Sequence, residues 1–361
     1  MTQPTRSVMG SAQELQVTGG IDTHKDTHTA AVLDSAGRLL GHRQFPTTPC
    51  GYRSLLAWLQ GFGLLLRVGV EGTGVYGAGL ARHLHAAGIE VVEVDRPDRK
   101  TRRWQGKSDP VDAEAAARAA LSGRATGTPK HRDGQVEALR ALRVARRSAI
   151  SNRAEAQTQM KSLVVTAPET LRTELRGLTT RRLITHCATR RPDHSRAKDP
   201  ATATLIALRS LAQRHQRLTA EIAELDALLG PLVAAINPGL VALNGVGTEV
   251  AGQLLVTAGE DPERLDSEAA FAMLCGAAPL PASSGRTHRH RLNRGGDRQA
   301  NAALYRIVLC RLRWDPRTRA YRDRRTTEGM SKKEIIRCLK RYIAREIYQE
   351  LLTSHDAPAV A

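Results

Sequence analysis

The stretch "VTGGIDTHKDTHTAAVLDSAGRLLGHRQF", residues 17–45, sets the order of the first structural elements. Its first six residues have the apolar and β-branched character of a short strand that ends at Asp22. A polar turn follows, and residues 28–45 then predict a hairpin that turns at residues 35–37. The stretch therefore predicts three consecutive antiparallel strands.

Strand and helix signals alternate after this hairpin. They predict a helix over 52–59, an apolar strand over 64–72, a helix near 80–85, a strand over 89–94 and a helix over 109–121. A continuously apolar strand is typical of a parallel pair that is buried on both faces. Three antiparallel strands followed by β-α-β alternation is the order expected of an RNase H-like fold. An actin-like ATPase fold begins in the same way, so the order alone leaves both folds open.

The rest of the chain is predicted to be mostly helical. One helix has a heptad pattern that indicates a coiled-coil seam, which we expect to stop at Gly230 and Pro231; the seam residues are Leu208, Leu211, His215, Leu218, Ile222, Leu225 and Leu229. A turn in "LNGVGTEVAGQLL", residues 243–255, resembles a helix-hairpin-helix turn whose amides could face a phosphate, or it is simply a tight turn. A last helix starts at the capping box formed by Ser331 and Glu334.

These signals predict five segments. They are a flexible N-terminus at 1–16, an α/β domain at 17–128, a helical coiled-coil or linker region at 129–235, a mostly helical C-terminal domain at 236–353 and a tail at 354–361.

The charge of the chain favours a polyanionic partner. Lysine and arginine number 54 against 36 acidic residues, and 45 of the 54 are arginine, which suits bidentate phosphate contacts. A predicted helix over 135–165 carries several of them, and we expect either contact with nucleic acid or a solvated helix face from Arg140, Arg143 and Arg147.

The cysteines and the termini indicate a soluble cytoplasmic protein. The five cysteines form no C-x-x-C pair, so we expect reduced thiols rather than a disulfide framework or a zinc cluster. No apolar stretch reaches the length of a membrane span, and the N-terminus lacks the apolar centre of a signal peptide.

Two acids end predicted strands. Asp22 ends the first strand, and Glu71 ends the apolar strand "LLLRVGVE". Because neighbouring strands lie about 5 Å apart and their ends converge at one edge of a sheet, we expect these carboxylates close together. A buried carboxylate without a countercharge is costly, and a divalent cation would supply that charge.

The stretch "KSDPVDAEAAARAAL", residues 107–121, predicts a helix whose start carries two more acids. Asp109 before Pro110 is a normal capping pattern, which explains the stretch without any further function. Asp109 and Asp112 also share one helix face, which can dock against the same strand ends. Four such oxygen ligands suit Mg²⁺ or Mn²⁺ and phosphoryl chemistry; the predicted catalytic metal ligands are Asp22, Glu71, Asp109 and Asp112. A weaker alternative is a zinc strand that uses His24, Asp26 and His28, but we expect the turn to point these residues away.

Ser283 and Ser284 before Gly285 form a second candidate site. A serine that attacks a DNA phosphate needs positive charge to stabilise the transition state. The surrounding cations would supply it as nucleic-acid-binding residues: Arg286, Arg289, Arg291, Arg294 and Arg298. We find no His-Asp pair at a spacing that suggests a hydrolase triad.

The motifs "GIDTHKDTHTAAVLD", "VGVEGTGVYG", "KSDPVDAEAAARAAL" and "CGAAPLPASSGRTHRHRLNRGGDRQANAAL" together resemble one family. It is the family of insertion-sequence transposases with an N-terminal RuvC-like DEDD domain and a C-terminal serine-bearing domain. The resemblance covers roughly residues 17–350. Its DEDD motif matches the four acids above, and its S-G motif matches Ser284 rather than Ser283.

The resemblance implies more than the residues do. It implies a DNA recombinase that excises and inserts a mobile element, guided by a structured bridge RNA that pairs with donor and target DNA. It implies a covalent phosphoserine link from Ser284, completed by the acidic tetrad with Mg²⁺ across subunits of a dimer or tetramer, in the cytoplasm near the nucleoid. One departure is Asp297, which stands where the family commonly has an amide.

Two other functions compete with this one. The first is a metal-dependent nuclease of the Holliday-junction type, which would use only the acidic tetrad. The second is an arginine-rich nucleic-acid-binding protein whose catalytic domain has degenerated.

Overall fold

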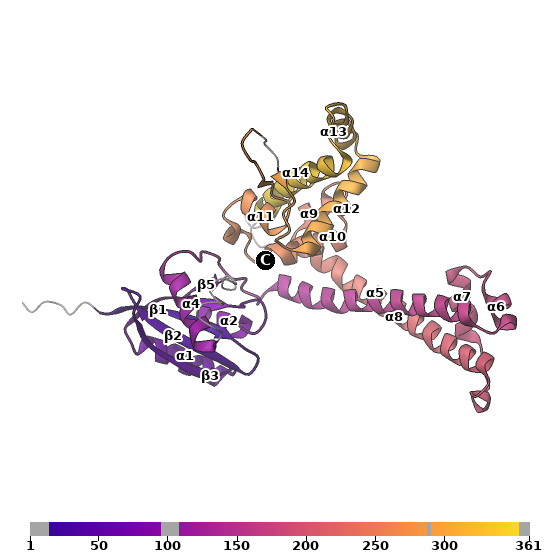
Figure 1. The fold of residues 1–361 in the computed structure, drawn as a ribbon, viewed down its shortest axis with the longest axis horizontal. Helices are drawn as coiled ribbons and strands as arrows, with labels where there is room; N and C mark the ends of the chain where they lie inside the picture. Colours follow the sequence, from indigo (N-terminus) through magenta and orange to yellow (C-terminus); the bar gives the residue numbers. More distant parts are fainter. Residues whose placement is uncertain (1–13, 95–107, 287–289, 354–361) are drawn as a thin grey trace, which may run out of the picture. The chain divides into compact units, whose positions relative to one another are not determined.

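The computed structural model describes residues 14–94, 108–286 and 290–353 of the chain. The chain forms two compact units (Figure 1). The first contains residues 1–134 and 259–264, and the second contains residues 135–258 and 265–361. The two units are described separately. Among the described residues, no helix has both the length and the apolar character of a membrane span.

The first unit is built on a mixed five-stranded sheet. Its order is β3-β2-β1-β4-β5, with β1 antiparallel to β2 and parallel to β4. The strands are β1 (Gln16–Thr23), β2 (Thr27–Asp34), β3 (Leu39–Pro46), β4 (Leu64–Glu71) and β5 (Glu90–Val94). This confirms the predicted hairpin and the parallel pairs that follow it, and the sheet is compatible with an RNase H-like domain.

Helices cover both faces of this sheet. The helices α1 (Pro49–Gln60) and α2 (Ala78–Ala86) supply Leu55, Leu59, Leu80 and Leu84 to the apolar core on one face. The helix α4 (Asp109–Leu121) packs on the opposite face. A Cβ at Gly20 would lie 2.1 Å from the Ala117 nitrogen, and a Cβ at Gly69 would lie 2.5 Å from the Ala116 oxygen.

Those two glycines therefore allow α4 to lie directly on the sheet. Because strand side chains alternate between faces, residues two positions from Gly20 and Gly69 point to the same face as α4. These residues are Asp22 and Glu71.

In the second unit, two long helices lie side by side, α5 (Gln135–Thr166) and α8 (Pro200–Ile236) (Figure 1). The predicted seam residues of α8 are buried or partly buried, whereas most positions between them are exposed. The seam thus has a partner within the same chain. At one end of the pair lie α6 (Glu169–Leu175) and α7 (Thr180–Thr189), which share a small apolar core with it. The short turn η1 (His194–Arg196) follows α7 along the chain.

The prediction that the seam helix stops at Gly230 and Pro231 is wrong. Helix α8 continues through Pro231 to Ile236. Proline removes one backbone hydrogen bond of the helix, but Leu229 and Val233 on either side are both buried in the core of the C-terminal region. This packing keeps the helix continuous.

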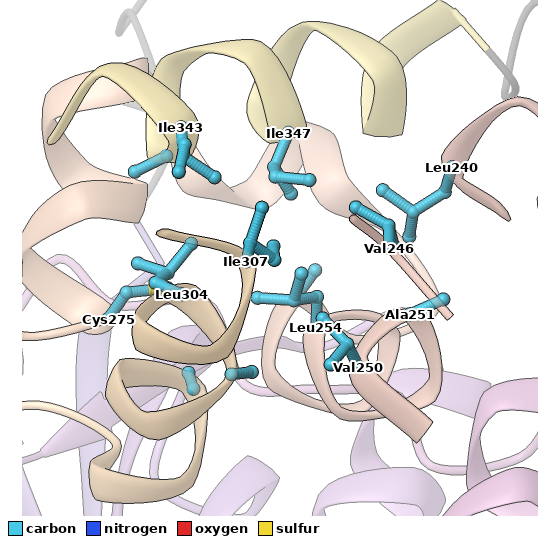
Figure 2. Close-up of a cluster of buried hydrophobic side chains, with 14 of the residues drawn as sticks. Leu240, Val246, Val250, Ala251, Leu254, Cys275, Leu304, Ile307, Ile343 and Ile347 are labelled. Carbon is cyan, nitrogen blue, oxygen red and sulfur yellow. The ribbon is translucent and has the colours of Figure 1, made fainter. Parts of the chain in front are cut away.

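The C-terminal region completes the second unit with helices of different lengths around one core (Figure 2). Its elements are α9 (Pro238–Ala242), α10 (Thr248–Ala258), α11 (Glu268–Leu274), β6 (Leu280–Pro281), β7 (His290–Arg291), α12 (Arg298–Trp314), α13 (Pro316–Thr327) and α14 (Lys332–Thr353). Between α10 and α11 along the chain comes a short turn of helix, η2 (Pro262–Leu265), whose first three residues belong to the first unit. Leu254, Ile307 and Ile347 meet where α10, α12 and α14 pack together.

Two local predictions in this region can be compared with the structure. Ser331 and Glu334 form the predicted capping box, with the Ser331 nitrogen donating to Glu334 Oε2 at 3.0 Å and the Glu334 nitrogen donating to Ser331 Oγ at 3.4 Å. Between α9 and α10, Gly245 has a φ of +80°, so a tight turn explains this glycine. The five cysteines all lie within the described residues and are free thiols there.

Candidate active site

The first two predicted acids stand at the ends of neighbouring parallel strands. Ile21 pairs with Val70, so Asp22 and Glu71 are the next residues along β1 and β4. Thr23 Oγ1 donates a hydrogen bond of 2.7 Å to the Glu71 carbonyl oxygen and ties the two strand ends together. Asp22 is only 7% exposed. The predicted juxtaposition of these strand ends is therefore present.

The other two acids lie at the start of α4. Ser108 is the N-cap, so the prediction that Asp109 caps the helix is wrong by one residue. The backbone determines this position of the cap. Ser108 has extended φ and ψ, and its carbonyl oxygen accepts the first helical hydrogen bond, from the Asp112 nitrogen. The Ser108 side chain makes no capping hydrogen bond. Asp109 is then the first helical residue, and Asp112 is buried in the first turn.

Three side chains converge where β1 meets the start of α4. The ligand atoms of Asp22, His24 and Asp109 lie within 4.8 Å of one another. His24 Nδ1 is 3.6 Å from Asp22 Oδ2 and 3.9 Å from Asp109 Oδ2. This nitrogen is buried and makes no hydrogen bond with any described residue. An unsatisfied buried nitrogen that faces two carboxylates fits a shared divalent cation.

The expectation that the turn points His24 away is therefore wrong. His24 is two residues after Asp22, and residues at this spacing in an extended chain point to the same side. That spacing is the signal that identifies His24 as a site residue. Among the described residues, the converging group includes neither Glu71 nor Asp112, which lie at the end of β4 and one turn into α4.

The alternative zinc strand is not assembled. His28 is fully buried and stacks on Tyr52 of α1, with ring centroids 5.7 Å apart, so it lies on the other face of the sheet. Burial lowers the pKa of His28. Asp26 is exposed in the turn. Of this motif, only Asp22 and His24 come together.

The serine candidate lies on the β6–β7 hairpin. Ser284 is exposed and precedes Gly285, whose φ of +54° turns the chain. Ser283 is exposed beside it. The surrounding arginines are exposed at the described positions Arg286, Arg291, Arg294 and Arg298, and Arg289 lies outside the described residues. The hairpin therefore exposes a hydroxyl, and the exposed arginines are its neighbours in sequence.

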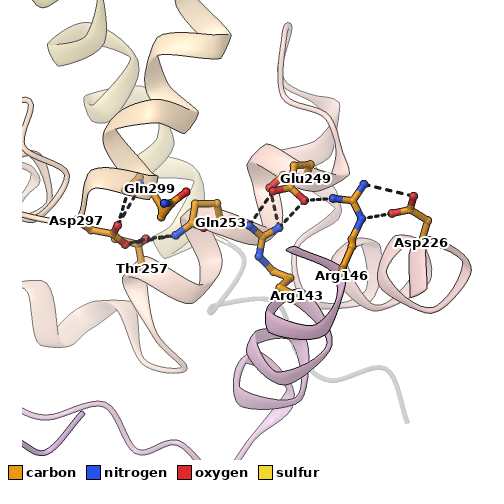
Figure 3. Close-up of polar contacts among 9 residues, drawn as sticks. Arg143, Arg146, Asp226, Glu249, Gln253, Thr257, Asp297 and Gln299 are labelled. Carbon is orange, nitrogen blue, oxygen red and sulfur yellow. Dashed lines mark hydrogen bonds and ion pairs between the residues drawn. The ribbon is translucent and has the colours of Figure 1, made fainter. Parts of the chain in front are cut away.

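Asp297 has a structural role that accounts for an acid in this basic loop. Its Oδ1 accepts hydrogen bonds from the Gln299 and Ala300 nitrogens at 2.7 and 3.2 Å, which caps α12. Its Oδ2 accepts a bond of 2.6 Å from the Thr257 hydroxyl (Figure 3). An asparagine could cap the same helix, so the departure from the family's amide keeps the local structure.

The arginines of α5 differ in their surroundings. Arg143 is mostly buried and donates to the Glu249 carbonyl oxygen at 2.8 Å and to its carboxylate, while Arg146 reaches Glu249 and Asp226 (Figure 3). Burial lowers the pKa of Arg143, and Glu249 opposes that shift. Arg140 is paired with Glu137. Arg147 is exposed, so contact with nucleic acid remains a prediction that Arg147 fits best.

Two regions of the chain match known families. Residues 19–167 match a DEDD-type family described as "Transposase", and residues 239–323 match the family described as "Transposase IS116/IS110/IS902 family". The first region contains Asp22, Glu71 and the start of α4, and the second contains the serine hairpin.

Two curated relatives are proteins of insertion elements. The chain is 34% identical over 134 residues to the "Insertion element IS110 uncharacterized 43.6 kDa protein" of Streptomyces coelicolor. This match covers 36% of this chain and 33% of the relative. It is 30% identical over 142 residues to the "Insertion element IS900 uncharacterized 42 kDa protein" of Mycobacterium paratuberculosis. This match covers 38% of this chain and 35% of the relative. The chain thus matches about a third of the length of these relatives. Both family matches and both relatives point the same way: over residues 19–167 and 239–323 the chain is similar to transposases, and the second match is to the IS116/IS110/IS902 family.

Proposed function

We propose that this chain is a DNA transposase that cuts and rejoins DNA strands to move a mobile element. The observation that carries the proposal is the convergence of Asp22, His24 and Asp109, with Glu71 on the same face of the sheet. Active sites commonly lie at the carboxyl ends of parallel strands, which is where these ligands cluster. The family matches supply the reaction class.

In the first unit, the chain's own residues would hold a divalent cation. Asp22 and Asp109 offer carboxylate oxygens and His24 offers Nδ1, while Glu71 and Asp112 stand beside them on β4 and α4. When bound, Mg²⁺ or Mn²⁺ stabilises negative charge on the oxygens of a reacting phosphate. The buried position of Asp22 keeps its carboxylate in place at the strand end, and α4 fixes Asp109.

In the second unit, we propose Ser284 as the nucleophile. Its Oγ would attack a DNA phosphorus, forming an Oγ–P bond while the bond from phosphorus to one deoxyribose oxygen breaks, and that oxygen takes up a proton. Attack by a hydroxyl of another strand on the same phosphorus would then release the serine and join the strands. The exposed guanidinium groups of Arg286, Arg291 and Arg294 would stabilise the charge on the phosphate oxygens.

Partners follow from the charge and the family resemblance. A net charge of +18 favours nucleic acid, and we propose donor and target DNA together with a structured guide RNA. We also propose that the acidic site of one subunit acts with the serine hairpin of another in a dimer or tetramer. Sequencing RNA that co-purifies with the protein tests the guide, since RNA transcribed from the DNA next to the gene is expected.

A trapped protein–DNA adduct tests the serine chemistry. The protein is incubated with Mg²⁺ and a plasmid that carries its gene with the flanking DNA, and then run on a denaturing gel. The native protein should give a covalent adduct that Ser284→Ala lacks and that Ser283→Ala, the matched neighbour, retains. DNA cleavage by Ser284→Ala at the native rate without an adduct would overturn the serine mechanism.

That outcome would favour a second candidate, a metal-dependent nuclease that uses only the acidic site. The observation in its favour is that the converging ligands all lie in the first unit, which has its own core. On this alternative, Asp109→Asn abolishes cleavage and Ser284→Ala does not.

A further inference from the structure

A pocket of about 620 Å³ lies in the second unit between the base of the β6–β7 hairpin and α14. Residues of both elements line it, including His290 and Arg291 on β7 and Arg337, Lys340 and Arg341 on α14. Pro281 pairs with His290, and Ser284 is three residues beyond Pro281. Three residues of extended chain span at most about 11 Å, so the pocket is close to the proposed nucleophile.

Lys340 is the unusual residue of this pocket. It is 6% exposed, and its Nζ donates a hydrogen bond of 2.9 Å to Asn301 Oδ1. Asn301 is neutral and in turn donates from Nδ2 to the carbonyl oxygens of Cys275 and Gly276, each at 2.9 Å. An ammonium group has three donors, and a buried cation is costly unless it is paired with negative charge. Among the described residues, no carboxylate pairs with Lys340.

The neighbouring charges do not compensate this ammonium. Arg341 is paired with Glu268, at 2.8 Å, so that acid is already engaged. Glu334, the one acid among the described lining residues, belongs to the capping box and lies 3.7 Å from Arg337. Burial, and then the proximity of Arg337, lower the pKa of Lys340. The pocket therefore has an excess of positive charge around a buried donor.

Most of the remaining lining is apolar, and Asn293 is its polar member. Ala277, Pro279, Leu292, Met330 and Tyr342 contribute to it. Its volume lies within the range of small-molecule sites, about 300–1,000 Å³, and exceeds what a phosphate alone would need. Cations at one part and an apolar or aromatic surface at another are what a nucleotide needs for its phosphate and its base.

We propose that this pocket binds a nucleotide of the DNA strand that is cut at Ser284, with Lys340 and Arg337 holding its phosphate. This rests on the proposed function, because the serine hairpin defines which strand lies beside the pocket. Lys340 would act as a positioning residue for that strand. Binding of the phosphate supplies the negative charge that the buried ammonium lacks.

Binding of a short oligonucleotide without a metal ion tests this proposal independently of catalysis. The full chain is titrated in EDTA with a fluorescent single-stranded deoxythymidine tetranucleotide. Lys340→Met and Arg337→Gln should each weaken binding by about tenfold, as expected when a charge-assisted contact is lost. Lys333→Met removes the same charge from an exposed position of the same helix and should change affinity less than about threefold.

Arg337 keeps the test decisive if Lys340→Met fails to fold, because the Arg337 side chain is 41% exposed and its loss leaves the core intact. If Lys340→Met and Arg337→Gln lose no more affinity for the deoxythymidine tetranucleotide than Lys333→Met does, the proposal is overturned. Tighter binding of the uridine tetranucleotide than of the DNA also overturns it, since the pocket would then fit an RNA. A missing Ser284 adduct, with the pocket variants still weakened, would instead count against the proposed function alone.

Protection of a cysteine locates the binding. Cys338 lines the pocket and is partly buried, and Cys310, also partly buried, is not among its lining residues. Alkylation mapped by mass spectrometry should slow at Cys338 and not at Cys310 when the deoxythymidine tetranucleotide is present. Equal rates at Cys338 with and without the oligonucleotide would place the binding elsewhere and overturn the proposal.

Discussion

Gly20 of β1 and Ala117 of α4 meet backbone to backbone, so closely that a Cβ on Gly20 would lie 2.1 Å from the Ala117 nitrogen. This contact fixes the depth at which α4 sits on the sheet. It thereby fixes where Asp109, at the start of that helix, meets Asp22 and His24.

Gly20→Val should therefore destabilise the first unit strongly. Overpacking of a core costs about 1–3 kcal/mol and occasionally more, and here the added side chain meets backbone, so the helix must shift away from the sheet. Urea denaturation measures the free energy of unfolding. Gly61→Ala is the control, because Gly61 has a φ of −65° and its added Cβ would meet only ordinary contacts at 3.4 Å; an equal loss in both variants would contradict the close contact.

Asp109→Asn should leave the helix intact and abolish metal-dependent cleavage. Ser108 is the N-cap, so the substitution removes only one favourable charge from the first turn, worth about 0.3–1 kcal/mol. Cleavage of plasmid DNA in Mg²⁺ and thermal unfolding are measured together. Glu114→Gln on the same helix is the matched control, since Glu114 pairs with Arg118 and is not in the converging group. Native cleavage by Asp109→Asn would show that Asp109 only starts the helix.

His24→Ala should weaken binding of Mn²⁺ by about tenfold and that of Mg²⁺ less, because an imidazole nitrogen favours Mn²⁺ over the harder Mg²⁺. Electron paramagnetic resonance of free Mn²⁺ gives the dissociation constant without any reaction. His42→Ala serves as the control, because His42 is exposed on β3. If both variants bind Mn²⁺ like the native protein, His24 is not a ligand.

Much of the first unit could be predicted from the sequence, because its strands carry strong local patterns. The hairpin and the ends of β1 and β4 follow from period-two and apolar runs, and these ends place Asp22 and Glu71. The two-residue spacing from Asp22 is a signal for His24 in the sequence, but it holds only if the chain stays extended through the start of the turn, and composition does not reveal those φ and ψ values.

The tertiary partners of the second unit could not be predicted in this way. Arg143 looks like a surface cation in the sequence, but Glu249, more than a hundred residues away, pairs with it. The cost of Pro231 in a helix is likewise overcome by packing of Leu229 and Val233. Local propensity cannot anticipate either contact.

Arg143→Met should reduce the stability of the fold, whereas Arg147→Met should reduce binding to DNA. Loss of Arg143 leaves the Glu249 carboxylate without one partner and should lower the free energy of unfolding by about 1–3 kcal/mol. Arg147 is exposed, so its loss should leave unfolding within about 0.5 kcal/mol of native while weakening binding to DNA. Chemical denaturation and salt-dependent DNA binding separate the two. A stable Arg143→Met that loses DNA affinity would reverse these roles.

The Glu268 carboxylate should contribute to the loss of stability of the second unit at acid pH. Hydrogen bonds from Arg341, and then from Arg345, lower the pKa of Glu268 to about 2, from an ordinary value near 4.5. Because the folded pKa is the lower one, the stabilisation is fully present above pH 4.5 and is lost as the pH falls from there towards 2. The ion pairs are partly exposed, so the contribution is small and falls with added salt.

Glu268→Gln should therefore make the free energy of unfolding fall less steeply between pH 4.5 and 2, measured by urea denaturation at low salt. Glu221→Gln, at an exposed position of α8, should leave the native slope unchanged. A Glu268→Gln variant with the native slope in this window would mean that Arg341 and Arg345 do not hold the carboxylate in solution.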